Sequence, residues 1–290
     1  MNFASDNQSG VSPAVLQGIV DASTGVAGSY SNDQWTQAAV AQLSAIFEKP
    51  VHVFFVATGT ASNCLALSAL VQPWHSILCH AQAHIAVDEL SAPELFTGGA
   101  RLVLIGDDGN KLTAQCLSDT LQSIPKDRPH NQIPGALSIT QCIFFDEALA
   151  KDFDLRRKRA GHLVSKGRLF GAQMCAWLKD DHWLTLARHA NELALALEHC
   201  LQPYPSIQIA WPVQANELFA VMPEPLFVYL KAQGVRLNDW LPSSVPQALD
   251  IKAGHLAVRF VTSFETEMTE VQQLQDLLTA YFDALVLANG

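Results

Sequence analysis

Two hydrophobic periods alternate along the first 125 residues of the chain. Short apolar runs at 53–56, 76–79 and 101–105 are rich in β-branched or aromatic residues, which is typical of strands. Stretches with helical spacing accompany them at 12–19, 35–47, 61–70, 84–90 and 113–123, with a turn predicted at 107–110 and a loop at 124–135. Strands that alternate with helices predict an α/β fold with a mostly parallel, doubly wound sheet.

The alternation breaks after residue 135. Residues 136–142 (ALSITQC) have a strand pattern, and the apolar run 143–145 (IFF) follows with neither a turn nor a helix between them. Parallel neighbours need a crossover of about a dozen residues or more, so these runs are not two consecutive parallel strands. We expect them to form one long or bent strand.

The remainder of the chain predicts a helical region and then a smaller domain. Helical spacing runs through 153–178 and 183–200, and the first stretch carries a basic cluster that by itself indicates a solvated helix face. Beyond Pro203 the pattern becomes α+β, with strands at 207–211, 217–222 and 255–261 and helices at 225–233 and 266–287. We therefore predict a large domain over 1–202 and a small C-terminal domain over 203–290.

Composition excludes several classes of protein. A net charge of −10 argues against a nucleic-acid partner, and 49% hydrophobic with 16% charged residues is ordinary for a globular protein. There is neither a signal peptide nor an uninterrupted apolar run of about 18 residues, so we expect a soluble protein without a membrane partner. The six cysteines have no metal-like spacing and fit the reduced thiols of a cytoplasmic protein.

The stretch 51–70 is the strongest candidate for a binding element. An apolar run leads into the small-residue turn Thr58-Gly59-Thr60, and a helical stretch follows. Such a turn aims free backbone N–H groups and a helix N-terminus at one point, which suits a phosphate. By themselves these residues favour the simpler interpretation, an ordinary capped turn with Thr60 as the N-cap.

Nine short motifs in a fixed order extend this picture over nearly the whole chain. They are FASDNQSG, YSNDQWT, FFVATGTASN, AHI followed by Asp88-Glu89, GNKLT, SITQ, RRKRAGHLVSKGR, PVQAN and RFVTSFET. In these motifs the chain resembles the low-specificity L-threonine aldolases, lyases that depend on pyridoxal 5'-phosphate (PLP). The resemblance implies a fold-type-I large domain of the aspartate-aminotransferase kind, with helices on both faces of its sheet, and a small α+β domain.

The resemblance also implies the residues of a cofactor site. The turn Thr58-Gly59-Thr60 would hold the PLP phosphate through backbone N–H groups and a hydroxyl. His84 would lie over the pyridine ring and help the β-hydroxyl proton to move, and Lys158 matches a family lysine close to the cofactor. Taken alone, His84 fits equally a satisfied histidine on a helix.

Two further residues are implied for the substrate, a β-hydroxy amino acid or a glycine-type small molecule. Arg259 would bind the substrate carboxylate with Ser5 assisting, since a planar guanidinium suits a bidentate carboxylate. Taken alone, Arg259 fits a surface arginine at a strand end and Ser5 a terminal cap. Ser31 departs from the family, which usually has glycine after the tyrosine.

Two motifs that the family chemistry needs are absent. The His-x-Asp-Gly-Ala-Arg motif supplies the aspartate at the pyridinium nitrogen, and the Gly-Gly-Thr-Lys-Asn-Gly motif supplies the Schiff-base lysine. Both normally lie between the SITQ strand and the strand that matches 143–145, which are fused at Cys142 here. The loss corresponds to two βαβ units, on the order of 60 residues, and so to two central strands.

The expected consequence is a family member with little or no threonine aldolase activity. None of the nine lysines lies in a matching motif, although Lys158 is a candidate substitute. We expect noncovalent PLP binding at most, apolar faces left uncovered, and a homo-oligomer, either a dimer or a tetramer. Two alternatives stay open: a non-catalytic binding or assembly partner of a full-length homologue, and an error in the gene model that hides an ordinary aldolase.

Overall fold

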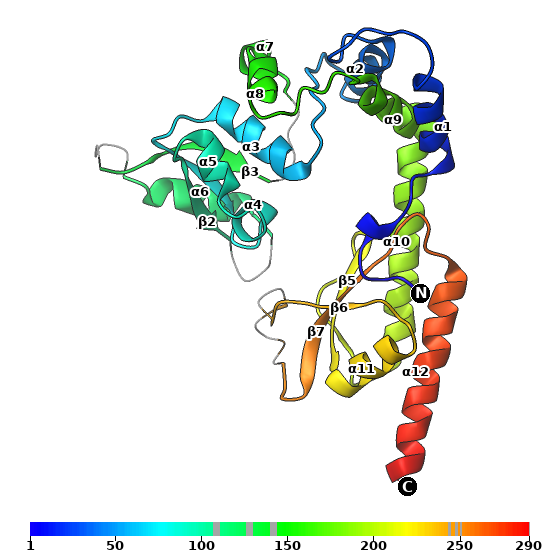
Figure 1. The fold of residues 1–290 in the computed structure, drawn as a ribbon. Coiled ribbons are helices and arrows are strands. Elements are labelled where there is room, and N and C mark those ends of the chain that lie inside the picture. The colour runs from blue at the N-terminus through cyan, green and yellow to red at the C-terminus, as the bar shows by residue number, and fades with distance from the viewer. Residues whose placement is uncertain are drawn as a thin grey trace. The chain divides into compact units, whose positions relative to one another are not determined.

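The chain forms two compact units. The computed structural model describes residues 1–106, 111–125, 130–139, 144–242, 245–246, 249 and 251–289. One unit is Pro13–Lys179, and the other joins Met1–Ser12 to Asp180–Gly290 (Figure 1). Helix α10 (His182–Leu201) belongs to the second unit because it packs against its strands and its last helix. The division at residue 202 predicted from the sequence concerns the family's domains and stays a prediction.

The Pro13–Lys179 unit contains a three-stranded parallel sheet in the order β2-β1-β3. The central strand β1 (His75–His80) pairs in parallel with β2 (Arg101–Ile105) and with β3 (Ile133–Ser138). The four middle residues of β1 are buried, as expected of a strand with neighbours on both sides. The predicted parallel α/β architecture is therefore confirmed for this sheet.

The connections between these strands are helical, as parallel pairing requires. They consist of α4 (His84–Val87), α5 (Ala92–Thr97) and α6 (Ala114–Ser123). Helix α3 (Gly59–Leu70), which precedes β1, contributes to a cluster of buried side chains made of Leu67, Val71, Ile77, Cys79, Ile85 and Ala100. This cluster joins α3 to the central strand and so fixes the direction in which α3 begins.

The outer strands of this sheet leave large apolar side chains in solvent. Leu104 on β2 is 55% exposed, Ile133 on β3 is 60% exposed, and Ile139 just after β3 is 75% exposed. Strand β3 alternates between partly buried and exposed residues, which is the pattern of an edge strand with one covered face. The predicted exposure of apolar positions is met at these residues.

Three helices of the same unit pack on one another away from the sheet. They are α1 (Pro13–Ala22), α2 (Gln34–Ile46) and α9 (Arg168–Leu178). A Cβ atom at Gly171 would lie 2.5 Å from the backbone nitrogen of Thr36, so only glycine lets α9 approach α2 this closely.

The buried strand predicted at 53–56 is wrong. This segment has no regular strand structure, and its neighbour His52 makes an isolated antiparallel bridge to Phe144. The apolar side chains still pack, since Phe54 and Val56 lie against a small cluster that contains Phe144 and Phe153. A strand needs a continuous backbone partner as well as apolar side chains, and among the described residues the bridge at the neighbouring His52 is the pairing found here.

The helical stretch predicted at 153–178 is broken into two helices. Helix α8 (Phe153–Arg159) follows the short α7 (Glu147–Ala150), and α9 begins only at Arg168. Gly161 has φ +77°, the left-handed conformation that commonly ends a helix, and this accounts for the break.

Other predictions in this unit are changed or fall outside the described residues. Strand β3 begins at Ile133, so the loop predicted at 124–135 is too long. The turn predicted at 107–110 lies outside the described residues. Residues 140–143 also lie outside them, and so does the proposed continuous strand across Cys142.

The second unit is built on a four-stranded sheet in the order β4-β5-β7-β6, with antiparallel neighbours. Its long strands are β5 (Glu217–Pro223) and β7 (His255–Val261), and its short ones are β4 (Gln208–Ile209) and β6 (Asn238–Asp239). The predicted α+β character of this part of the chain agrees with the sheet.

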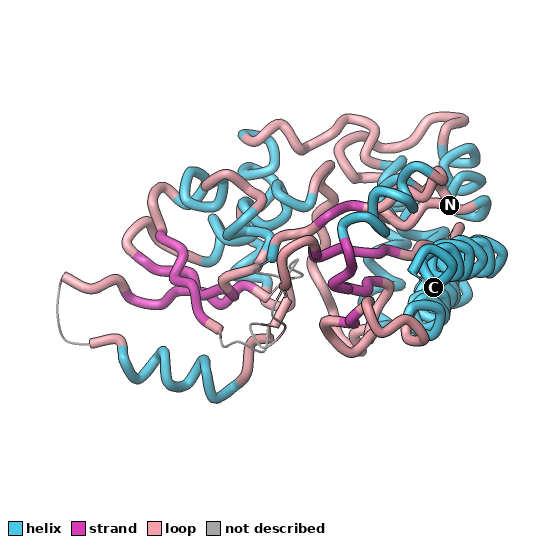
Figure 2. The backbone as a smooth tube through the Cα atoms, turned by 90° about the horizontal axis from the view of Figure 1, so that it is seen from below, coloured by secondary structure: helices cyan, strands magenta, loops and turns pink. Residues whose placement is uncertain are grey.

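Helices α10, α11 (Glu224–Ala232) and α12 (Met268–Asn289) cover this sheet, and in Figure 2 the helices beside the C-terminus lie along one side of its strands. The N-terminal segment completes the unit. Phe3 is fully buried; its N–H donates to the Arg236 carbonyl at 3.0 Å, and its carbonyl accepts from Val261 N–H at 2.8 Å. Among the described helices, none combines the length and the apolar character that crossing a membrane requires.

Candidate functional site

The phosphate-type turn lies at the start of α3. Thr58 is the N-cap, and its Oγ1 accepts a hydrogen bond from Ala61 N–H at 3.1 Å, so the cap is Thr58 and not Thr60. Thr58 and Gly59 are exposed, and Thr60 is partly buried. The first N–H groups of a helix have no acceptor within the helix. The amides of Gly59 and Thr60 therefore point from a helix N-terminus towards solvent, an arrangement suited to an anion.

A histidine from the basic segment contacts this turn. His162, three residues beyond the end of α8, accepts a hydrogen bond at Nδ1 from Ala57 N–H at 3.2 Å. The residue belongs to the RRKRAGHLVSKGR motif, but its contact with the turn was not anticipated. The signal that could have indicated it was the basic character of the motif, which suits the surroundings of a phosphate.

His84 is held by a buried carboxylate. It is the first residue of α4, its side chain is 62% exposed, and its Nδ1 lies 2.7 Å from Oε1 of Glu89. The Glu89 side chain is fully buried, and Asn63 Nδ2 donates to the same oxygen at 2.7 Å. When Nδ1–H donates to a carboxylate, Nε2 remains available to solvent or a ligand.

Glu89 belongs to the motif in which Asp88-Glu89 follows AHI, but the sequence did not indicate it as a site residue. It also affects the neighbouring thiol: burial raises the pKa of Cys64 to about 11, with the carboxylates of Glu89 and Glu94 adding to the effect. Cys64 is therefore a protonated, inert thiol at neutral pH and not a nucleophile.

Lys158 lies in the same unit as the turn but contacts an aromatic ring. Its Nζ lies 5.3 Å from the ring centroid of Tyr30, within the range of a cation–π contact, and both side chains are exposed. Tyr30 and Ser31 adopt φ values of 57° and 67°, in the left-handed region. The left-handed conformation at Ser31 is one that glycine adopts most easily, which agrees with the glycine that the resemblance implies at this position.

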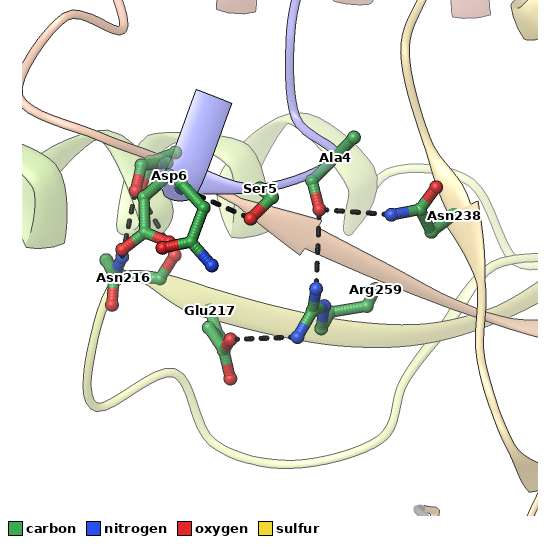
Figure 3. Close-up of polar contacts among 9 residues, drawn as sticks. Ala4, Ser5, Asp6, Asn216, Glu217, Asn238 and Arg259 are labelled. Carbon is green, nitrogen blue, oxygen red and sulfur yellow. Dashed lines mark hydrogen bonds and ion pairs between the residues drawn. The ribbon is translucent and has the colours of Figure 1, made fainter. Parts of the chain in front are cut away.

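Arg259 and Ser5 lie together in the second unit (Figure 3). Arg259, on β7, donates from Nη2 to the Ala4 carbonyl at 3.4 Å, next to Ser5. Ser5 Oγ accepts from Asn7 N–H at 3.2 Å and caps the short helix η1 (Asp6–Gln8). The structure thus places both predicted carboxylate-binding residues at one end of this sheet.

Arg259 has partners that the sequence did not indicate. Its Nη1 lies 3.3 Å from Oε1 of Glu217 on β5, and its guanidinium carbon lies 3.9 Å from the ring centroid of Trp240. Its Nε is buried without a hydrogen-bond partner among the described residues. Burial raises the pKa of Glu217, Arg259 opposes that shift, and the nearby Asp6 carboxylate adds to it.

The predicted site residues are divided between the two units. The turn Thr58-Gly59-Thr60, His84 and Lys158 belong to the Pro13–Lys179 unit, whereas Ser5 and Arg259 belong to the other. Within the described residues there is no cluster of three or more metal-ligating side chains, and the sequence predicted no metal site.

Comparison with known proteins identifies the relatives of the chain. The sequence profile of the beta-eliminating lyase family matches residues 2–144. A low-specificity L-threonine aldolase from Pseudomonas aeruginosa is 30% identical, and the alignment covers 94% of this chain and 95% of that protein. A second one, from a Pseudomonas species, is 29% identical, with 97% of this chain and 98% of its own length covered.

Solved structures show the same fold. A threonine aldolase from Leishmania major superimposes with a TM-score of 0.87 at 20% identity, over 97% of this chain and 99% of that one. A serine palmitoyltransferase from Sphingomonas wittichii matches with a TM-score of 0.64 at 15% identity, over 99% of this chain and 88% of its own. Another serine palmitoyltransferase, solved with PLP, has a TM-score of 0.65.

The alignments also reveal a difference in length. The alignment with the Pseudomonas aeruginosa protein runs over 341 positions, although the whole chain has 290 residues. The relative therefore has residues with no counterpart here. Identity at this level over nearly the full length of both proteins places the chain in the low-specificity L-threonine aldolase family.

Proposed function

We propose that this chain binds PLP and a small amino acid but cleaves L-threonine or allo-threonine to glycine and acetaldehyde weakly or not at all. The observation that carries the proposal is the excess of alignment positions over residues, because it supports a loss of internal sequence. The motifs that would supply the Schiff-base lysine and the pyridinium aspartate are missing from the chain.

The residues present fit the phosphate end of the cofactor. The exposed amides of Gly59 and Thr60 would bind phosphate oxygens, and the N-terminus of α3 favours their negative charge. His84 would serve the ring end, with Glu89 engaging Nδ1 so that Nε2 can take or give a proton. When bound, PLP supplies an electron sink for the pair that is released as the Cα–Cβ bond breaks.

The residues do not fit covalent attachment of the cofactor. That attachment needs a lysine amine at the cofactor carbonyl. Lys158 is the candidate on the basic helix, and it lies over the Tyr30 ring with its amine exposed. A lysine that attacks a carbonyl is usually activated by a desolvated apolar pocket or a neighbouring cation, and this exposed amine lies in no such pocket. PLP would therefore be held noncovalently, by its phosphate.

The test is a PLP titration of the purified chain, followed by borohydride reduction and an assay for acetaldehyde from L-threonine. We expect PLP to bind and to be removed by dialysis, with neither a trapped adduct nor cleavage. Trapping in the unchanged chain that disappears in Lys158→Ala would make Lys158 the replacement lysine. Cleavage at the rate of a full-length aldolase would overturn the proposal.

A mass measurement tests whether the loss is real. The chain has a mass of 31.6 kDa, and we expect the protein isolated from its natural source to have that mass. A mass several kilodaltons higher, or additional coding sequence between Gln141 and Ile143, would make the protein an ordinary aldolase and overturn the proposal.

A second candidate function is assembly with a full-length homologue in the cytoplasm. The exposed apolar side chains of β3 and its surroundings favour it, because such surfaces commonly mark sites of association. A chain without its own lysine would then form dimers or tetramers with copies of itself or with the homologue. Coexpression with a tagged full-length aldolase tests this: copurification supports a mixed assembly, and separate elution contradicts it.

A further inference from the structure

We infer that Arg259 and Glu217 together form a binding site for a free α-amino acid zwitterion, with Glu217 as the residue that selects an ammonium group. The inference rests on the proposed function, because it takes the ligand class from there. It goes beyond it in assigning the ammonium to a side chain of this chain, so that binding needs neither PLP nor a lysine.

The guanidinium of Arg259 is accessible to a ligand from one direction. Its Nε is buried, and Nη2 is committed to the Ala4 carbonyl, which also accepts from Asn238 Nδ2 at 3.3 Å (Figure 3). One face lies against the ring of Trp240. The side chain as a whole is 18% exposed, and the N–H groups left for a carboxylate are those of Nη1, which faces Glu217, and the second N–H of Nη2.

Glu217 lies at that opening and is able to move. Its side chain is 41% exposed, and the 3.3 Å separation from Nη1 is longer than the roughly 2.7–2.9 Å of a strong charge-assisted hydrogen bond. Arg259 is mostly buried but Glu217 is open to water, so the Glu217 carboxylate can turn into solvent when a ligand carboxylate takes its place on Nη1. A carboxylate that reaches Nη1 must displace Glu217 and leaves the acidic side chain beside the ligand.

The local charge decides which ligand is favoured. The charged groups that act on Glu217 are Arg259, from β7, and Asp6, from η1. Asp6 is held beside Glu217 because its Oδ2 accepts from Nδ2 of Asn216, the preceding residue, at 3.2 Å. One cation against two carboxylates makes the site net negative, so a simple monocarboxylate adds to the repulsion.

A zwitterion avoids this repulsion. Its carboxylate replaces Glu217 on Nη1 of Arg259, and its ammonium group neutralises the Glu217 carboxylate that it displaces. Asp6 adds a second favourable charge at the ammonium end. The site should therefore distinguish glycine from acetate, which has the carboxylate alone, and from methylammonium, which has the cation alone.

The experiment is an NMR titration of the full chain without PLP, using glycine, acetate and methylammonium chloride as probes and the indole signal of Trp240 as the reporter. We expect glycine to bind at least about tenfold more tightly than either of the other two. Glu217→Gln should reduce glycine binding to the level of acetate, and Arg259→Gln should abolish both. Glu192→Gln, at an exposed position of α10, is the matched control and should leave all affinities unchanged.

Acidification provides a second readout with opposite signs for the two probes. Burial raises the pKa of Glu217, so lowering the pH from about 7.5 towards 5 begins to protonate it. Glycine affinity should fall, because the ammonium loses its partner, whereas acetate affinity should rise, because Arg259 is released. In Glu217→Gln both profiles, calculated for the ionised form of each probe, should be flat.

Equal affinities for glycine and acetate in the unchanged chain, an unaffected Glu217→Gln variant, or no binding of either probe would overturn the inference. The proposed function fails separately, by a borohydride-trapped adduct or by threonine cleavage. Trp240 reports the carboxylate site and the cofactor absorbance reports the PLP site, so the two failures are distinguishable.

Discussion

The cores of the two units differ in size. Among the described residues of the unit that contains Asp180–Gly290, one large cluster joins Phe3, the strands β5 and β7, and the helices α10, α11 and α12, and a small second cluster surrounds Val221 and Ala257. Among those of the Pro13–Lys179 unit, the buried apolar side chains form small clusters, one beneath β1 and one around Phe144 and Phe153. The unit with Arg259 therefore has a large core, whereas the unit with His84 leaves apolar strand positions exposed.

This difference agrees with the internal loss that we propose. The proposed place of the loss, next to Cys142, falls within the Pro13–Lys179 unit, and that unit has exposed apolar strand positions. A loss of internal sequence would leave such exposed apolar side chains. When a strand or helix that covers a sheet is lost, the apolar surface beneath it becomes exposed to solvent.

The largest effect on stability is expected when a side chain in the large core of the Asp180–Gly290 unit is shortened to alanine. Leu274→Ala removes a fully buried side chain on α12 and should lower the free energy of unfolding of its unit by about 2–5 kcal/mol. Hydrogen exchange of the β5 and β7 amides measures it. Leu195→Ala, at a 42% exposed position of α10, is the control and should change it by less than about 0.5 kcal/mol. A loss for Leu274→Ala no larger than the control's would contradict the packing of Leu274 in this core.

A polar substitution examines the Pro13–Lys179 unit. Glu89→Gln replaces a buried carboxylate that accepts hydrogen bonds from His84 and Asn63, and should destabilise the Pro13–Lys179 unit by about 1–3 kcal/mol. Exchange of the β1 amides measures this, and the nitrogen shifts of His84 report the loss of its fixed tautomer. Asp88→Asn, at the exposed neighbouring position, should change neither quantity. Unchanged His84 shifts in Glu89→Gln would show that the carboxylate does not position the ring.

Substitutions of Thr58 and Thr60 distinguish helix capping from ligand binding at the start of α3. Thr58→Ala removes the N-cap of α3 and should cost about 1 kcal/mol of stability, because Ala61 N–H loses its acceptor. Thr60→Ala should leave stability nearly unchanged and weaken PLP binding. Thermal unfolding with and without PLP measures both. Equal losses of stability in the two variants would contradict the assignment of Thr58 as the cap.

The smallest effect is expected at Ser31. Its φ of 67° is strained for a residue with a side chain, so Ser31→Gly should stabilise the Pro13–Lys179 unit by up to about 1 kcal/mol. Ser29→Gly, at a position outside the left-handed region, should be neutral or slightly destabilising because it only loosens the unfolded chain. A destabilised Ser31→Gly would mean that the contact between Ser31 Oγ and Arg157 Nη2, at 3.5 Å, outweighs the strain.

The sequence predicted correctly several strands and helices that belong to a regular alternation of the two. Strand β2 (Arg101–Ile105) and strand β7 (His255–Val261) begin and end at the predicted residues, and α6 (Ala114–Ser123) differs from the helix predicted at 113–123 by one residue at its start. The run at 53–56 has the same composition as a buried strand, yet it forms none. Side-chain chemistry predicts where a segment will pack, but backbone pairing depends on which other segments the chain contains.

The residues of the candidate site stay predictions, and the sequence did not indicate their structural partners. Arg259, Ser5 and His84 follow from motifs that are local in the sequence. Glu217, Trp240, Glu89 and His162 act through contacts that only folding creates; the Arg259–Glu217 pair, for example, spans 42 residues and two strands. A local pattern carries no information about such a neighbour, and the neighbour decides whether a charge is free or neutralised.

The N-terminal segment has a consequence for the order in which the chain folds. Phe3 fills the core of a unit whose other elements begin after Lys179, so residues made first must wait for residues made last. Domains generally fold as they leave the ribosome, the earlier ones first. The Pro13–Lys179 unit is therefore synthesised completely before the other unit can fold, and the edges of its sheet are exposed during that time. The unit with the larger core is completed only when α12 has emerged from the ribosome.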